Sequence, residues 1–166
     1  NTEIQSLEAK NINTSDVIAP LSGYYISNLD GYEGAMDYDK IDSLTVSDAE
    51  KLFKRKPDDV SGRMGKIVGS YKWYLVTVMD GKYSLVLNEG DKMKINMPYY
   101  GFKNVEVVVE KISKTDGGKV AVAFSCNMMN ETYANMRTED IELVFREFTG
   151  YKVNSSSIHR EKDEKN

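Results

Sequence analysis

Sulfur-bearing side chains make the densest group of potentially reactive residues in this chain. Cys126, Met128 and Met129 lie close together, with Met136 nearby. Thiolate and thioether sulfurs are the soft ligands that suit Cu(I). No histidine stands beside them, and the eight methionines are spread along the chain, so we expect these side chains to fill a core. The sequence therefore predicts no metal site.

Groups suited to acid–base chemistry are scattered. The one histidine, His159, stands at the edge of a charged tail, where a general base would lack a fixed neighbour. The adjacent pairs Asp58-Asp59 and Glu139-Asp140 are typical of solvated turns. Gly117-Gly118 lacks the pattern of a phosphate-binding loop. We therefore expect no catalytic residues, no cofactor and no enzyme.

Composition narrows the classes of partner. The 166 residues include 22 basic and 26 acidic side chains, giving a net charge of −4 and a pI near 5.2. Nucleic-acid binding needs a concentrated basic face, so we expect no nucleic-acid partner. No apolar run reaches the 18 or more residues of a membrane span. The first residue is Asn1 and not Met, so we expect an excised ectodomain whose membrane anchor lies in a missing N-terminal segment.

The elements that would position any site are mostly strands. Short β-forming runs with alternating apolar residues, separated by glycine-containing turns, predict a small barrel or sandwich from Gly62 onward. In Lys92–Met97 the alternation places Met93, Ile95 and Met97 on one face. Further strands are expected at Met64–Tyr71, Trp73–Met79, Val105–Ser113, Val120–Ser125 and Ile141–Phe145.

Helical signals are few. Ser47 and Glu50 fit a capping box for a helix over about Asp48–Arg55, which Pro57 would stop. Asn1–Asn13 has a fragment of helical periodicity, and a frayed N-terminal helix explains it as well as the end of a coiled-coil arm does. Residues 155–166 are densely charged and predict a mobile tail.

The stretch Val17–Glu33 has a distinctive order of breaks. Pro20 and Gly23 precede a predicted strand, Tyr24–Leu29, and Asp30-Gly31 predicts a hairpin turn. The predicted tip has no lysine to carry a lipoyl or biotinyl group. Asp30, Tyr32 and Glu33 could form a contact surface for a partner, whereas turn chemistry alone also explains an ordinary solvated loop.

Taken in order, these segments resemble HlyD-like membrane fusion proteins, also called periplasmic adaptor subunits, in the version found in Gram-positive bacteria. Val17–Glu33 resembles the second half of their lipoyl-like module. Gly65–Phe124 resembles the family's β-barrel domain and would begin with a strand pair, Lys66–Val68 and Trp73–Val76. Within it, Glu89–Ile95 is similar to the family's G-D-x-V-x-V entry into a strand. Arg137–Ile158 resembles the closing segment, with Asn154 in place of the usual proline.

The resemblance implies a mainly β fold: a small antiparallel β-barrel domain plus half of a lipoyl-like barrel-sandwich module, with one or two short helices. It implies four parts: the end of a coiled-coil arm (1–13), the half-module and a linker helix (14–60), the barrel (61–154) and the tail (155–166). Because the lipoyl-like module needs two halves, we expect this half to pack imperfectly or to borrow strands from a neighbouring molecule.

The implied function is that of a non-catalytic adaptor ectodomain, anchored at the cell surface of a Gram-positive bacterium. It would couple an efflux or secretion transporter to extracytoplasmic partners. Its expected partners are a transporter permease of the ABC type, other copies of the same chain, or both. The alternative is an extracytoplasmic β-barrel sensor that binds a glycan or an amphiphile through Trp73, Tyr74, Tyr99, Tyr100 and Phe102. The transported substrate is open in either case.

Overall fold

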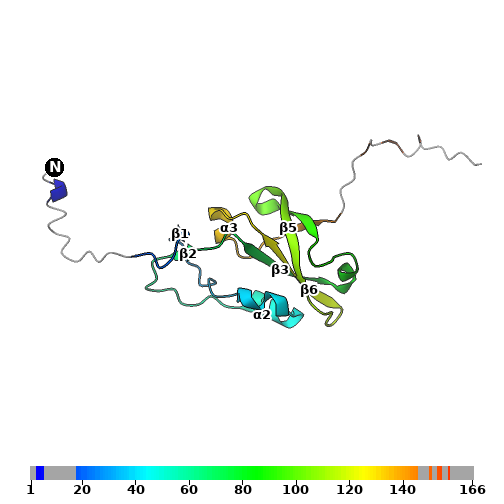
Figure 1. The fold of residues 1–166 in the computed structure, drawn as a ribbon, viewed down its shortest axis with the longest axis horizontal. Coiled ribbons are helices and arrows are strands. Elements are labelled where there is room, and N and C mark those ends of the chain that lie inside the picture. The colour runs from blue at the N-terminus through cyan, green and yellow to red at the C-terminus, as the bar shows by residue number, and fades with distance from the viewer. Residues whose placement is uncertain (1–2, 6–17, 146–149, 151–152, 155–156, 158–166) are drawn as a thin grey trace, which may run out of the picture.

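The computed structural model describes residues 3–5, 18–145, 150, 153–154 and 157. Most of the proposed coiled-coil arm (1–13) and of the charged tail (155–166) lies outside these residues, so both interpretations stay predictions. The described part contains a two-stranded sheet, a five-stranded sheet and a few short helices (Figure 1). None of the described helices is long and apolar enough to cross a membrane.

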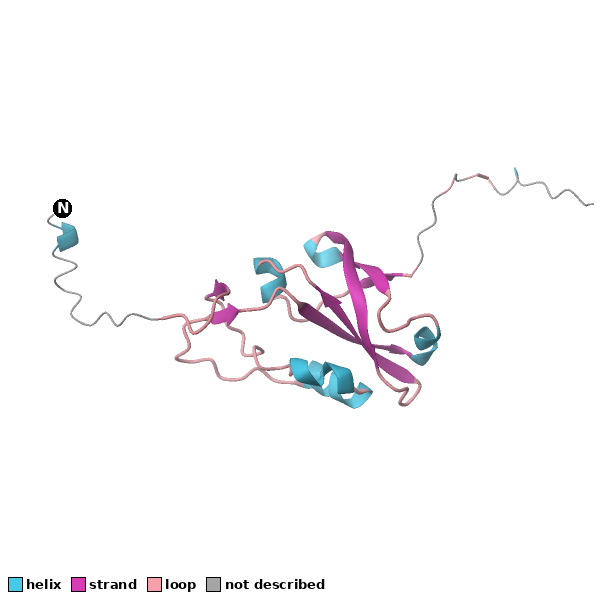
Figure 2. Ribbon diagram, viewed as in Figure 1, coloured by secondary structure: helices cyan, strands magenta, loops and turns pink. Residues whose placement is uncertain are grey.

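The five-stranded sheet is antiparallel and has the order β3-β6-β5-β4-β7. Its strands are β3 (Trp73–Asp80), β4 (Lys92–Met97), β5 (Phe102–Ile112), β6 (Lys119–Cys126) and β7 (Glu142–Val144). The long strand β5 pairs with β4 along its first part and with β6 along its second part, and a register shift lies between Val109 and Lys111. Such bulges increase local twist and bend. The result is a curled half-barrel, with β3 and β7 at the edges of the described sheet (Figure 2).

The apolar side chains of the alternating strands form the core on the concave face of the half-barrel. Ile95 and Met97 on β4 are buried and Met93 packs beside them, as the period-two pattern predicts. Val120, Val122 and Phe124 on β6 project into the same core, which β5 completes with valines. The short helices η2 (Gly81–Leu85), η3 (Pro98–Tyr100) and α3 (Glu131–Asn135) connect these strands. The mainly β prediction is thus confirmed.

The other face of β6 is buried as well. Helix α2 (Val46–Lys54) lies along β3 and β6 (Figure 1). Its Ala49 packs against Ala121. Small side chains on both surfaces let the helix approach the sheet closely. The connection before α2 contains the 3-10 helix η1 (Tyr38–Ser43). The sequence analysis places this helix in the half-module (14–60), whereas in the structure it packs on the half-barrel. The boundary between the two parts near residue 60 stays a prediction.

The start of α2 differs from the sequence prediction. Thr45, and not Ser47, is the N-cap: its Oγ1 accepts a hydrogen bond from the backbone N of Asp48 at 3.1 Å. The same hydroxyl donates to the Asp48 carboxylate at 2.6 Å. Ser47 and Glu50 predict a capping box two residues later. Both T-V-S-D and S-D-A-E have a hydroxyl residue followed by an acidic residue three positions on, so the local pattern fits either start. Packing of Val46 and Ala49 on the sheet selects the earlier start.

The small sheet corrects two further predictions. Strand β1 (Tyr24–Ile26) pairs antiparallel with β2 (Lys66–Val68), whereas the sequence had paired Lys66–Val68 with the strand at Trp73. The predicted hairpin at Asp30-Gly31 is also wrong, because β1 ends at Ile26 and the next described strand is β2. Gly23 allows the close approach of the paired segments, since a Cβ there would lie 2.4 Å from the Val68 carbonyl oxygen. Pairing across the sequence therefore replaces the local hairpin.

Candidate functional site

The three residues predicted to contact a partner lie in a folded loop between β1 and η1. Asp30 accepts from the backbone N of Tyr32 at 3.1 Å. The Glu33 carboxylate accepts from the backbone N of Asp30 at 3.2 Å and of Gly31 at 3.0 Å. All three side chains are half-buried. Whether they also bind a partner stays a prediction.

Gly31 fixes the shape of this loop. Its φ is +82°, and its carbonyl accepts from the backbone N of Asp58 at 2.8 Å. A Cβ at this position would lie 2.3 Å from the Asp58 carbonyl oxygen. The loop is therefore pressed against the segment after α2, and no side chain fits between them. Arg55, at the end of α2, adds a bond from its guanidinium to the Gly34 carbonyl at 3.0 Å.

Arg137 connects this loop to the half-barrel. It stands in the connection between α3 and β7, and its Nε lies 2.7 Å from Oδ2 of Asp30. Its second contact is from Nη2 to Oε1 of Glu33, at 3.4 Å. Lys66 on β2 approaches the same Glu33 oxygen, at 3.6 Å. We call these four residues, Asp30, Glu33, Lys66 and Arg137, the junction cluster.

The electrostatics of the junction cluster favour the charged form of its two carboxylates. Desolvation raises the pKa of Asp30, but the hydrogen bond and charge of Arg137 and the Tyr32 N–H outweigh it, so the pKa is lowered overall. Desolvation likewise opposes ionisation of Glu33, and backbone N–H groups bring its pKa below the usual value. Desolvation and the charge of Arg137 lower the pKa of Lys66. The arrangement holds two segments of the chain together through ion pairs.

A second polar cluster lies on the sheet. Lys72 forms an ion pair with Glu110, whose other oxygen accepts a hydrogen bond from the Ser125 hydroxyl at 2.8 Å. The bond to Glu110 raises the pKa of Lys72, and the same bond lowers that of Glu110. A protonated lysine cannot act as a base toward the serine. We read this cluster as one that satisfies polar groups at the edge of the core.

The aromatic residues predicted as a ligand site form most of one row. Trp73 stacks on Tyr133 with ring centroids 5.0 Å apart, and Phe102 also contacts Tyr133, in a tilted arrangement with centroids 5.0 Å apart. Tyr100 stacks on Phe102, and Tyr99 meets Tyr100 edge-on. These rings pack on one another while Tyr99 stays exposed, and glycan or amphiphile binding here stays a prediction. Nothing in the sequence around Asn130–Asn135 distinguished Tyr133, since long-range packing recruits it.

The remaining predicted residues are placed by packing. Tyr74 stands apart from the row, against Tyr38 with centroids 5.6 Å apart. Cys126 is buried in the core, with Met129 and Met136 packed against the same cluster, while Met128 is exposed. Core filling explains the two half-buried methionines. In the described part of the chain, no three His, Cys, Asp or Glu residues gather in a way that could hold a metal ion.

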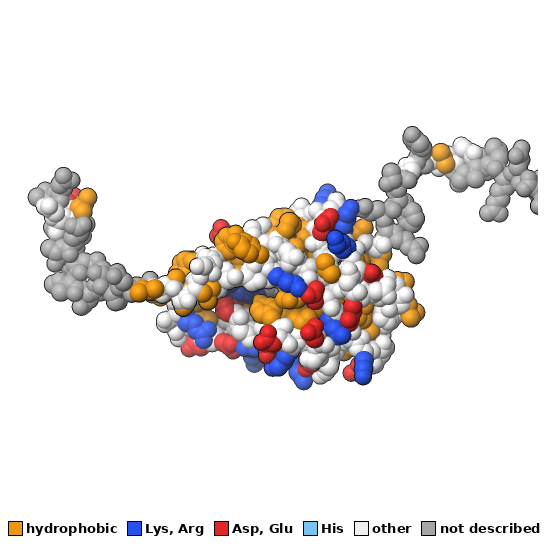
Figure 3. Space-filling view, viewed as in Figure 1, with side chains coloured by type: hydrophobic (Ala, Val, Ile, Leu, Met, Phe, Trp, Pro, Cys, Tyr) orange, Lys and Arg blue, Asp and Glu red, His pale blue; other side chains and the backbone are white. Residues whose placement is uncertain are grey.

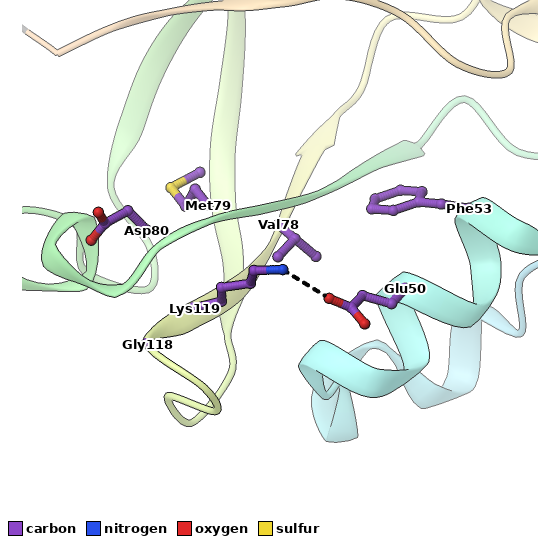
Figure 4. A pocket seen from close by; sticks show the side chains of 7 residues that line it. All are labelled: Glu50, Phe53, Val78, Met79, Asp80, Gly118 and Lys119. Carbon is purple, nitrogen blue, oxygen red and sulfur yellow. Dashed lines mark hydrogen bonds and ion pairs between the residues drawn. The ribbon is translucent and has the colours of Figure 1, made fainter.

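A shallow pocket of about 460 Å³ opens between α2 and the ends of β3 and β6 (Figure 4). Its residues are Glu50, Phe53, Val78, Met79, Asp80, Gly118 and Lys119. Lys119 Nζ lies 3.2 Å from Oε1 of Glu50, and this ion pair crosses from strand to helix (Figure 4). Glu50 and Lys119 are already paired with each other and the pocket is open, so its geometry suits a seam between helix and sheet better than a small-molecule site.

Comparison with known families adds one finding. Residues 73–147 match the family model described as "RND related, beta-barrel domain". The matched segment begins at the first residue of β3 and ends just beyond β7, so it contains all five strands of the half-barrel and omits β1, β2 and α2. It covers less than half of the chain. No curated protein and no solved structure matches the chain.

Proposed function

We propose that this chain is a non-catalytic adaptor ectodomain that couples a membrane transporter to extracytoplasmic partners. The observation that carries the proposal is the coincidence of the matched segment, residues 73–147, with the complete half-barrel. This match supports a role of the membrane-fusion or adaptor type and does not distinguish the HlyD-like branch from others. The HlyD-like assignment, the ABC-type permease and the Gram-positive cell surface are the finer parts of the proposal.

Mechanically, an adaptor must pass a fixed orientation from one part of the molecule to another. The small sheet and the half-barrel share the junction cluster, in which Arg137 contacts two carboxylates that lie more than a hundred residues earlier in the chain. Arg55 fastens the same loop to the end of α2. These contacts support a role in which the two units move together and not independently.

Binding in such a protein would use surfaces and not a cleft. The half-barrel buries its apolar residues in one core, and the pocket beside α2 is shallow. The polar clusters on the described residues are ion pairs already satisfied within the chain. We therefore place the transporter contact on the outer surface of the half-barrel, with no residue assigned.

Site-specific photo-crosslinking in membranes tests the proposal. A photoreactive residue would replace exposed side chains on the half-barrel, such as Lys103 on β5 and Asn127 after β6, and a matched set would replace Ser47 and Lys54 on α2. We expect adducts with an integral membrane protein from the half-barrel positions. A full-length protein that stays soluble without membranes and yields no such adduct from any position would contradict the adaptor function.

A further inference from the structure

Exposed apolar side chains gather around the small sheet. Tyr25 on β1 is 64% exposed, and Met64 and Tyr71, on either side of β2, are 64% and 66% exposed. Ile18, Leu21 and Tyr24 are exposed in the same region. The corresponding end of the molecule is rich in apolar surface in Figure 3. Scattered apolar residues are normal on a protein surface, whereas a group of this kind on one small unit indicates an interaction surface.

The backbone of the small sheet is also incomplete. β1 and β2 each have one strand neighbour, namely each other, so within the described residues each has a free edge. A free edge offers unpaired N–H and C=O groups to another strand. A sheet of two strands is marginal in water without further strands or a covering layer. The small sheet therefore gains most from a partner that brings a strand and covers the tyrosines.

The free edges of β1 and β2 differ in the charge of the residues around them. The twelve residues Ile18–Leu29, which include β1, contain no charged side chain, although 29% of the chain is charged. Proteins usually protect edge strands with charges, lysine above all. β2 has that protection: it contains Lys66, and Arg63 and Lys72 flank it. A copy of β2 facing β2 would set cations against each other, whereas a copy of β1 facing β1 would meet no repulsion.

We propose that β1 pairs, edge to edge and antiparallel, with β1 of a second copy of this chain. A two-fold axis brings a strand antiparallel to its own copy, so the contact is self-complementary without any second sequence. The paired sheet would have four strands and would shelter Tyr24 and Tyr25 from water. Tyr25 is already held in place, because its hydroxyl donates to the Met64 carbonyl at 2.7 Å. The proposal goes beyond the adaptor function and does not depend on it.

Sedimentation of the full chain from roughly 1 μM to roughly 1 mM tests this pairing, because a short strand contact predicts a weak dimer. The test variant is Ser22→Lys with Ser27→Lys, which puts cations beside β1 at exposed positions. The control is Ser47→Lys, exposed on α2. We expect a dimer at high concentration whose Kd rises at least about tenfold in the test variant and stays unchanged in the control.

Amide hydrogen exchange gives a second, local readout. Protection of the Tyr24–Ile26 amides should increase with the concentration of the unaltered chain and should stay flat in the double-lysine variant. Circular dichroism of each variant verifies that the fold is kept. A chain that is monomeric at every concentration, or a dimer that responds equally to the edge lysines and to Ser47→Lys, would overturn the proposal.

Discussion

Arg137 Nε lies 2.7 Å from Oδ2 of Asp30, and this contact joins the loop after β1 to the connection before β7. The two residues lie more than a hundred positions apart in the sequence and are brought together by tertiary folding. Both side chains keep about a third of their surface exposed, at 32% and 35%. The contact is thus geometrically well formed but partly screened by water.

Removing the arginine tests the strength of this contact. We expect Arg137→Gln to lower the free energy of unfolding by roughly 1 kcal/mol, the upper range for a partly exposed pair with good geometry. Asp30→Asn should cost a similar amount, and the double variant should cost less than the sum, because the two changes remove one interaction. Chemical denaturation of the four proteins measures the coupling. Lys103→Gln, at an exposed position of β5, is the matched control, and additive costs would show that the pair contributes nothing.

Acid should weaken the same junction. The pKa values of Asp30 and Glu33 lie below their ordinary values of 3.8 and 4.5 in the folded protein. A carboxylate of this kind stabilises the fold fully above its unfolded pKa, and the stabilisation is lost as the pH falls through the lowered value. The difference in unfolding free energy between the unaltered chain and Arg137→Gln should therefore be constant above about pH 5 and shrink below about pH 4. A difference that grows on acidification would refute the assignment.

Alanine substitutions at Gly31 and Gly62 distinguish the cost of backbone strain from the cost of a steric clash. Both adopt a left-handed φ, +82° and +81°, but a Cβ would strike the Asp58 carbonyl only at Gly31 and would meet open space at Gly62. Gly62→Ala should cost roughly 1 kcal/mol, which is the conformational penalty. Gly31→Ala should cost clearly more, because the loop must move away from the segment after α2. Thermal unfolding of both variants provides the comparison, and equal shifts in Tm would show that the loop is not tightly apposed.

Substitutions of Thr45 and Ser47 test which of the two hydroxyl side chains caps the N-terminus of α2. Thr45→Ala removes the side chain that accepts from the Asp48 N–H and should lower stability by roughly 1 kcal/mol. Ser47→Ala, within the box predicted from sequence, should be nearly neutral or slightly stabilising, since alanine is the better helix former. Urea denaturation distinguishes the two. A larger loss at Ser47 would mean that the helix begins two residues later in solution.

Ala49 tests how closely α2 lies on the half-barrel. Its side chain is fully buried against Ala121, so Ala49→Leu should force the helix outward and cost roughly 1–3 kcal/mol. Lys51→Leu, two residues further along α2 and on its exposed face, serves as the control for adding an apolar side chain. The free energy of unfolding of both variants decides the matter. A tolerated leucine at Ala49 would indicate that the helix is only loosely attached.

Much of the half-barrel could be predicted from local patterns. In β4 the alternation of Met93, Ile95 and Met97 with polar residues defines which face is buried, because side chains alternate across a strand. Gly117 and Gly118, both with positive φ, make the turn between β5 and β6 where a glycine pair predicts one. These signals act between near neighbours in the chain.

The junction cluster could not be found in the same way. Asp30-Gly31 favours a hairpin turn on its own, and nothing nearby indicates that Asp30 contacts a residue in the connection before β7. The predicted partner of β2 was wrong, since a three-residue strand carries too little pattern to choose between β1 and β3. In both cases the choice depends on contacts between segments that are distant in sequence.

The sequence by itself determined that the chain is mainly β, which residues face the core of the half-barrel and where its tight turns lie, because periodicity and turn chemistry are local properties. Tertiary structure decided that α2 covers the alanine face of β6, that Tyr133 completes the aromatic row and that Arg137 joins Asp30 and Glu33 to the half-barrel. Long-range packing and ion pairing depend on which surfaces meet after folding, and local sequence does not encode that meeting.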